Sequence, residues 1–140
     1  LSIKKLGLKV SDVNEYYNYS HELGIAQIDT NNLQDKIFGI ECNFEELNGI
    51  DFRKGCYVGQ ENTARIKLKD KLNKRLFAIK VLDGEINSDE ITSENKNLGK
   101  LLINNKNPFA LLKLEDKSFN FDKDLKCGDA KIKVLRPNWI

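Results

Sequence analysis

One stretch of eight residues brings together more chemically capable side chains than any other part of the sequence. Residues 54–61 read Lys-Gly-Cys-Tyr-Val-Gly-Gln-Glu, so the thiol of Cys56 lies between two glycines, with an amine before it and a carboxylate after it. Because glycine permits positive φ angles and close backbone approach, Gly55 and Gly59 predict a tight, sterically open turn that presents Cys56 and Tyr57. We call this stretch the octapeptide and expect the function of the chain to lie there.

Cys56 is the candidate with the most definite chemistry. A nearby cation or a helix N-terminus favours the thiolate form of cysteine, and Lys54, Arg65 and a short helix beginning near Gly59 would supply both. The thiolate would then bind a metal or an iron–sulfur species, or attack an electrophile. The alternative is a small, buried apolar residue, and the residues alone leave both interpretations open.

The other polar and aromatic residues around the thiol each have two interpretations. Lys54 and Arg65 would clamp an acidic small molecule, or they are two solvated charges. Glu61 would orient Lys54 or bond an amide-rich heterocycle, or it is a first-turn glutamate stabilised by the helix dipole. Tyr57 would stack on a planar ligand, although an aromatic residue beside a turn more often fills a core.

The remaining cysteines and the single histidine carry weaker signals. Cys42 and Cys127 lack a glycine-rich or basic setting and are interpreted as structural. Three widely spaced cysteines without a C-x-x-C pair are a poor disulfide framework and a poor zinc site, and they suit a reducing compartment. His21, near the end of a predicted helix, is interpreted as a surface cap rather than a catalytic base.

A run of basic residues follows the octapeptide: Arg65, Lys67, Lys69, Lys71, Lys74 and Arg75. It is similar to a stripe that binds nucleic acid, and an RNA-contacting protein is one alternative function. The run has no interleaved aromatic residues, however, and Asp70 interrupts it. A solvated strand edge protected by lysines is the favoured interpretation.

Composition limits the class of protein. The 140 residues are 40% hydrophobic and 31% charged, which is typical of a soluble globular chain of one domain or two small ones. A net charge of +2 is too small to predict binding to nucleic acid or to an anionic membrane. The sequence shows neither a membrane-spanning apolar run nor a signal peptide. It starts at Leu1 and contains no methionine, so we expect a piece of a longer protein.

The first half of the sequence predicts helices and short extended segments. Residues 3–10 predict an edge strand. Asp12 and Glu15 form a capping box for a helix that ends at Gly24. Further along, we expect a short helix over 44–47 capped by Asn43, an extended run over 50–53, and one or two helical turns over 61–65.

The second half predicts strands. Short β-prone segments separated by turn residues indicate a small antiparallel barrel; they are residues 74–82, 90–93, 98–103, 109–114 and 131–135. The fold class is therefore α+β, with a change from helix-rich to strand-rich sequence near residues 65–73. We divide the chain into residues 1–65 and 66–140.

The octapeptide resembles the signature of the YgfZ-type folate-binding proteins, whose mitochondrial relatives act in iron–sulfur cluster assembly. The resemblance extends over most of the chain, through residues 41–52, 63–65, 74–77, 99–100, 110–112 and 136–139. A position after Lys69 where the family often has glycine is Asp70 here.

This resemblance implies a three-lobed protein related to the aminomethyltransferase of the glycine cleavage system, with tetrahydrofolate in a central hole. Residues 1–65 would be the C-terminal part of the folate-binding core, and residues 66–140 the C-terminal β-barrel. The implied function is that of a folate-dependent accessory factor that assembles or maintains iron–sulfur proteins, including radical enzymes that thiolate tRNA. Its partners would be iron–sulfur enzymes or assembly factors, with tRNA involved only indirectly and no membrane.

The family's functional positions carry over to the matching residues here. Cys56 would be the functional thiol, and seven residues would bind tetrahydrofolate: Lys54, Gly55, Tyr57, Gly59, Gln60, Glu61 and Arg65. The expected compartment is the cytoplasm of a bacterium, with the mitochondrial matrix as the alternative.

The enzyme-class alternative is a tetrahydrofolate-dependent aminomethyltransferase of the glycine cleavage system. That activity needs a catalytic carboxylate from a region that precedes these residues. Those enzymes also lack the Gly-Cys-Tyr motif found at residues 55–57, which favours the accessory factor.

Overall fold

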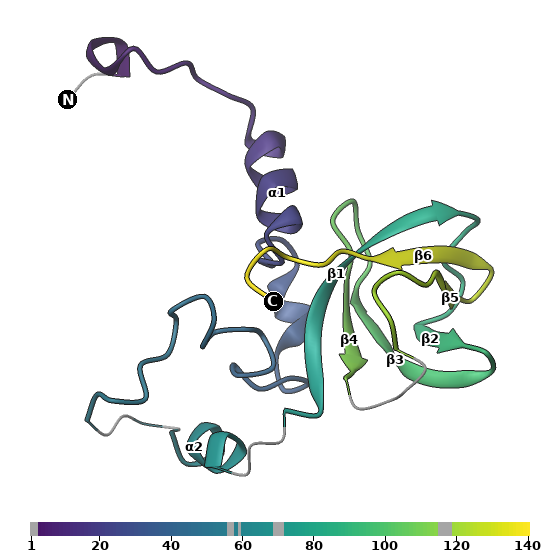
Figure 1. The fold of residues 1–140 in the computed structure, drawn as a ribbon. Coiled ribbons are helices and arrows are strands. Elements are labelled where there is room, and N and C mark those ends of the chain that lie inside the picture. The colour runs from purple at the N-terminus through teal and green to yellow at the C-terminus, as the bar shows by residue number, and fades with distance from the viewer. Residues whose placement is uncertain (1–2, 56–57, 59, 69–71, 115–118) are drawn as a thin grey trace.

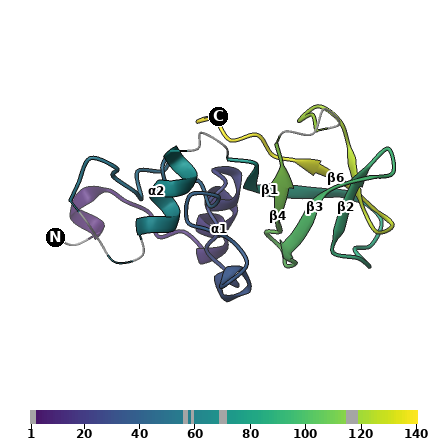
Figure 2. The same cartoon turned by 90° about the horizontal axis from the view of Figure 1, so that it is seen from below.

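The chain consists of a helical, loop-rich part followed by a β-barrel (Figure 1). The structure, a computed structural model, describes residues 3–55, 58, 60–68, 72–114 and 119–140. Seen from below, the barrel lies on one side and the two α-helices on the other (Figure 2). The helical elements are η1 (Ile3–Leu6), α1 (Val13–Glu22), η2 (Thr30–Leu33) and α2 (Gln60–Leu68). No helix among the described residues is both long and apolar enough to cross a membrane.

Six antiparallel strands close the barrel in the order β1-β4-β3-β2-β5-β6. Their bounds are β1 (Lys74–Asp83), β2 (Glu90–Ser93), β3 (Lys96–Ile103), β4 (Phe109–Lys113), β5 (Leu125–Cys127) and β6 (Ala130–Val134). The predicted α+β class with a small antiparallel barrel is therefore confirmed. Sequence patterns missed β5, because a strand of three residues is too short to show an alternation.

The barrel interior is filled by alternate residues of the strands. In β6 the burial alternates from buried Ala130 to exposed Lys131 and back to buried Ile132, as expected for a strand with one face on the core. Gly99 of β3 allows β4 to approach closely, since a Cβ there would lie 2.1 Å from the carbonyl oxygen of Leu111. The interior is thus a packed core.

The predicted first helix is confirmed, and the details of its cap differ. Gly24 follows α1 with φ +73°, as a C′ glycine does. The Asp12 side chain accepts a hydrogen bond from Asn14 Nδ2 at 2.9 Å instead of capping the backbone. The Glu15 carboxylate accepts a hydrogen bond from the hydroxyl of Ser11.

The edge strand predicted over residues 3–10 is wrong. The segment contains the 3₁₀ turn η1 and then extends away from the body of the molecule, above α1 in Figure 1. The barrel closes on its own six strands. A strand needs a neighbouring edge to satisfy its backbone groups, and residues 3–10 pair with none of those strands.

Two further predictions in the loop before α2 are wrong. Residues 44–47 form turns and not a helix, because Asn43 directs its side chain at the carbonyl of Leu76 instead of capping. Residues 50–53 bend, since the Asp51 carboxylate accepts a 2.9 Å hydrogen bond from the backbone N–H of Arg53. The helical turns predicted over 61–65 are confirmed within the longer α2, and the division at residue 65 stays a prediction.

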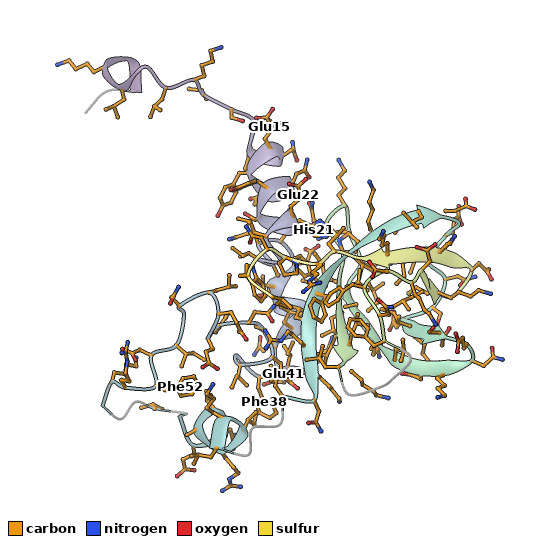
Figure 3. All side chains as sticks on the ribbon, viewed as in Figure 1. Glu15, His21, Glu22, Phe38, Glu41 and Phe52 are labelled. Atoms are coloured by element: carbon orange, nitrogen blue, oxygen red, sulfur yellow. The ribbon has the colours of Figure 1, made fainter. Side chains whose placement is uncertain are left out.

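His21 is not the surface cap that the sequence predicted. Figure 3 shows it on the side of α1 that faces the barrel. Its Nε2 lies 3.0 Å from the carbonyl oxygen of Pro108 and its ring meets Phe109 edge-on at 5.1 Å. Nearby, Trp139 Nε1 donates a 2.9 Å hydrogen bond to the carbonyl of Leu23. His21 therefore belongs to the contact between α1 and the barrel.

Acidification is expected to weaken this contact. Burial lowers the pKa of His21, and the hydrogen bond to Pro108 and the charge of Glu22 offset this only in part. The unfolded chain therefore binds a proton at His21 more readily than the folded chain, and folding stability falls as the pH drops from 7.5 to 5.5. We expect the melting temperature of the wild type to fall more over this range than that of His21→Gln, whose amide retains a donor. Equal pH profiles would contradict this role.

Candidate functional site

The octapeptide connects a surface loop to the start of α2. Of its eight residues the structure describes Lys54, Gly55 and Val58, and Gln60 and Glu61 at the beginning of α2. The predictions made for Cys56, Tyr57 and Gly59 lie outside the described residues. Nothing is described of the Gln60 side chain. The site is therefore defined by the residues on both sides of the thiol.

The loop that leads to the thiol is open to solvent. Its turn is closed by Asp51, whose carbonyl accepts the N–H of Lys54 at 3.4 Å. Lys54 and Gly55 are exposed. A Cβ added to Gly55 would meet nothing within 4 Å, and its φ is not in the left-handed region. Gly55 thus provides the predicted open approach, without adopting the positive φ that glycine allows.

The first turn of α2 presents a carboxylate and its second turn a guanidinium. Glu61 and Arg65 are both exposed and are four residues apart, so they share one face of the helix. The N-terminal position of Glu61 also suits the helix dipole. This face of α2 thus presents an exposed acceptor and an exposed cation, and Lys54 is exposed on the loop that precedes the helix.

The opposite side of α2 is tied to the loop before the octapeptide. Lys67 Nζ lies 2.5 Å from Glu45 Oε1 and 5.6 Å from the centre of the Phe52 ring. Phe52 lies on the loop beside α2 in Figure 3. These contacts hold the helix against the chain that precedes it.

The basic run is the solvated strand edge that the sequence favoured only at Lys74, which is exposed at the start of β1. Arg65 and Lys67 lie on α2. Arg75 Nη2 lies 2.6 Å from Glu46 Oε1, and the Arg75 side chain is only 14% exposed. Lys69, Asp70 and Lys71 lie outside the described residues. Two cations of the run are thus already paired with carboxylates, which weakens it as a phosphate-binding stripe.

The two described thiols are poor nucleophiles. Burial, with a smaller contribution from the charge of Glu41, raises the pKa of Cys42 to about 11. Burial, and then the charge of Asp89, also raises the pKa of Cys127. Both therefore stay protonated at neutral pH. In the described part of the chain, no three His, Cys, Asp or Glu residues are grouped so that they could hold a metal ion.

Sequence reasoning missed an apolar cavity of about 340 Å³ between the helical part and the barrel. Its lining comes from residues 24–47 and from Leu76 of β1, and includes the Cys42 side chain. The sequence analysis predicted no helix or strand over residues 25–40. Their apolar residues recur without a helical or strand period, so no pattern indicated that they line one cavity.

Comparison with known proteins shows what the barrel is similar to. Residues 73–140 match the family described as CAF17, C-terminal beta-barrel domain. The chain is 34% identical over 73 residues to the mouse protein named iron-sulfur cluster assembly factor IBA57, mitochondrial. This match covers 52% of this chain and 20% of the mouse protein. It is 32% identical over 77 residues to the human protein of the same name, covering 55% of this chain and 22% of the human protein.

A fungal relative gives the same result. The chain is 39% identical over 62 residues to the Aspergillus oryzae protein named iron-sulfur cluster assembly factor IBA57 homolog, mitochondrial. That match covers 44% of this chain and 14% of the relative. The matched stretch thus spans between 14% and 22% of the length of these three relatives. The predicted resemblance to the C-terminal part of this family is confirmed.

Proposed function

We propose that this chain, with its CAF17-type barrel at residues 73–140, serves in the assembly or maintenance of iron–sulfur proteins. The observation that carries the proposal is its similarity to relatives that are named iron–sulfur cluster assembly factors. The octapeptide supports it from within the sequence, since it combines a thiol with an open, charged surface. In this proposal Cys56 is the functional thiol.

We propose tetrahydrofolate as the cofactor of this surface. Its two carboxylates suit the exposed cations Lys54 and Arg65, and the N–H groups of its heterocycle suit the carboxylate of Glu61. Gly55 leaves room for a planar ring to approach the backbone. Tyr57, Gly59 and Gln60 complete the proposed set. Bound tetrahydrofolate would supply a carrier of one-carbon units.

The proposed partners are iron–sulfur enzymes and their assembly factors. Radical enzymes that thiolate tRNA are one class of client, so that tRNA is involved only through them. Of the two compartments that the sequence left open, we propose the mitochondrion, because the three relatives described above are named mitochondrial. The bacterial cytoplasm is the alternative.

Replacing Cys56 with alanine in the gene that encodes this chain tests the proposed role of the thiol in the assembly or maintenance of iron–sulfur proteins. We expect the activity of iron–sulfur enzymes in the host to fall several-fold, while enzymes without a cluster keep their activity. Cys42→Ala is the matched control, because this half-buried thiol has a raised pKa and no assigned role. Full activity of every iron–sulfur enzyme in the Cys56→Ala strain would refute the proposed role of the thiol.

Calorimetric titration with tetrahydrofolate tests the cofactor separately. Glu61→Gln and Arg65→Gln are each expected to weaken binding about tenfold or more, since each removes a charge-assisted hydrogen bond. Binding by the wild type and by Cys56→Ala alike would place the thiol outside the folate contacts. A wild type that binds no tetrahydrofolate would remove the cofactor from the proposal and leave the iron–sulfur role to the first experiment.

A further inference from the structure

The first half of β1 has one barrel strand beside it, and the segment before the octapeptide occupies its other side. β1 pairs with β4 over residues 74–78 and with β6 from Ile79 onward. Beside the first half, the N–H of Leu76 donates to the carbonyl of Glu41 at 2.8 Å, and the carbonyl of Leu76 accepts from Asn43 Nδ2, also at 2.8 Å. The side-chain amide of Asn43 thus takes the place of a strand's backbone N–H.

The same asparagine also contacts a partly buried ion pair. Asn43 Oδ1 accepts a hydrogen bond from Arg75 Nη1 at 3.3 Å, and Arg75 Nη2 lies 2.6 Å from Glu46 Oε1. Asn43 is 0% exposed, and both ends of its amide are bonded. We call Asn43, Glu46 and Arg75 the junction latch.

Residues 41–55 have few other contacts with the barrel, among them the packing of Cys42 against the cluster that contains Leu76 and Phe109. Within residues 41–55, Asn43 is the only buried residue, while Phe44 and Phe52 are exposed. Asn43 also lies at φ +66°, a left-handed conformation that asparagine tolerates better than most residues. Glu46 Oε2 is buried without a hydrogen-bond partner among the described residues, so the closed arrangement retains an unsatisfied group. The segment is therefore held to β1 by a few directional contacts and by the packing of Cys42, and one polar atom of these contacts has no partner among the described residues.

We propose that the junction latch is a conformational device that fixes the octapeptide loop on the barrel and opens while the barrel stays folded. With the latch closed, residues 41–43 lie along β1 and carry the following loop toward α2 at a set position. With the latch open, the loop through Lys54 loses its attachment to β1. This inference does not depend on the folate or iron–sulfur proposal.

The chain contains its own reporters for the two states. Cys42 is half-buried beside the junction latch and packs against the cluster that contains Leu76 and Phe109. Its thiol therefore becomes exposed to solvent when residues 41–43 separate from β1. Cys127 lies inside the barrel, where its thiol donates to the carbonyl of Ser88 at 3.1 Å, and it is uncovered only when the barrel unfolds. The rates at which a maleimide labels these thiols distinguish local from global opening.

Asn43→Gly, made in a Cys56→Ser background, is the decisive variant. Glycine adopts positive φ without strain, so this change removes the two side-chain hydrogen bonds and keeps the backbone conformation accessible. Asn48→Gly is the matched control, because Asn48 also has positive φ, 58°, and its side chain is exposed. Labelling is followed peptide by peptide with mass spectrometry.

We expect Cys42 in Asn43→Gly to be labelled at least tenfold faster than in the background protein, with the rate at Cys127 unchanged. Asn48→Gly should leave both rates unchanged. If Asn43→Gly does not fold, Arg75→Lys serves instead, since lysine retains the charge opposite Glu46 but cannot contact two groups at once. An unchanged Cys42 rate, or rates at Cys42 and Cys127 that rise together, would overturn the proposal.

Discussion

Gly99→Ala is expected to destabilise the barrel by about 3 kcal/mol, at the upper end of the usual range for overpacking. Gly99 of β3 lies between Ile91 of β2 and Leu112 of β4. An added Cβ would lie 2.1 Å from the carbonyl oxygen of Leu111 and 2.9 Å from Leu112 Cδ2. The nearer atom belongs to the backbone of a paired strand, so relief requires the sheet itself to move. Thermal and urea unfolding measure the effect.

Gly55→Ala is the matched control for this experiment. The new Cβ would meet nothing within 4 Å, and the backbone there does not need positive φ. We expect a stability within about 0.5 kcal/mol of the wild type. A Gly99→Ala protein as stable as Gly55→Ala would mean that β3 and β4 do not approach as closely as described.

Phe77→Ala is expected to cost about 3–5 kcal/mol, the usual range for removing a fully buried phenylalanine. Phe77 is 1% exposed, and its ring lies 5.9 Å from that of Phe119 and 5.3 Å from that of Phe121. Such pairs add to the stability that burial alone provides. Because small domains are stable by only about 5–15 kcal/mol, this one change removes a large share of the total.

Phe38→Ala provides the comparison. Phe38 is 49% exposed and lies on the loop before the octapeptide, so its loss should change the unfolding free energy by about 0.5 kcal/mol or less. Urea unfolding of both variants gives the two numbers directly. Equal destabilisation would contradict the assignment of Phe77 to the core and of Phe38 to the surface.

The barrel was predictable because its signals are local. In β6 (Ala130–Val134) buried and exposed residues alternate, and turn glycines at positive φ follow β1 (Gly84) and precede β6 (Gly128). The exception is β5, which has too few residues to alternate. Strand order was not predictable from these patterns, since it depends on how the barrel closes.

The contacts between the helical part and the barrel were not predictable, because they join residues that are far apart in the sequence. His21 shows the ordinary signs of a helix end, and only the approach of Pro108 makes it a buried donor. Asn43 shows the signs of a helix cap, yet its partners are Arg75 and Leu76. For the candidate site, the sequence identified the exposed Lys54, Glu61 and Arg65, while it could not show that Arg75 is already paired.

The first half of β1, which has β4 on one side and residues 41–43 on the other, affects the order of folding. Contacts between residues far apart in sequence form late, because closing a long loop costs chain entropy before the contact stabilises it. β1 joins β6 more than 50 residues away, at Ile79 and Val134, whereas residues 41–43 dock on an edge that exists only once β1 is in place. Residues 41–43, although they are synthesised before the barrel, therefore acquire their position only after β1 has formed the edge on which they dock.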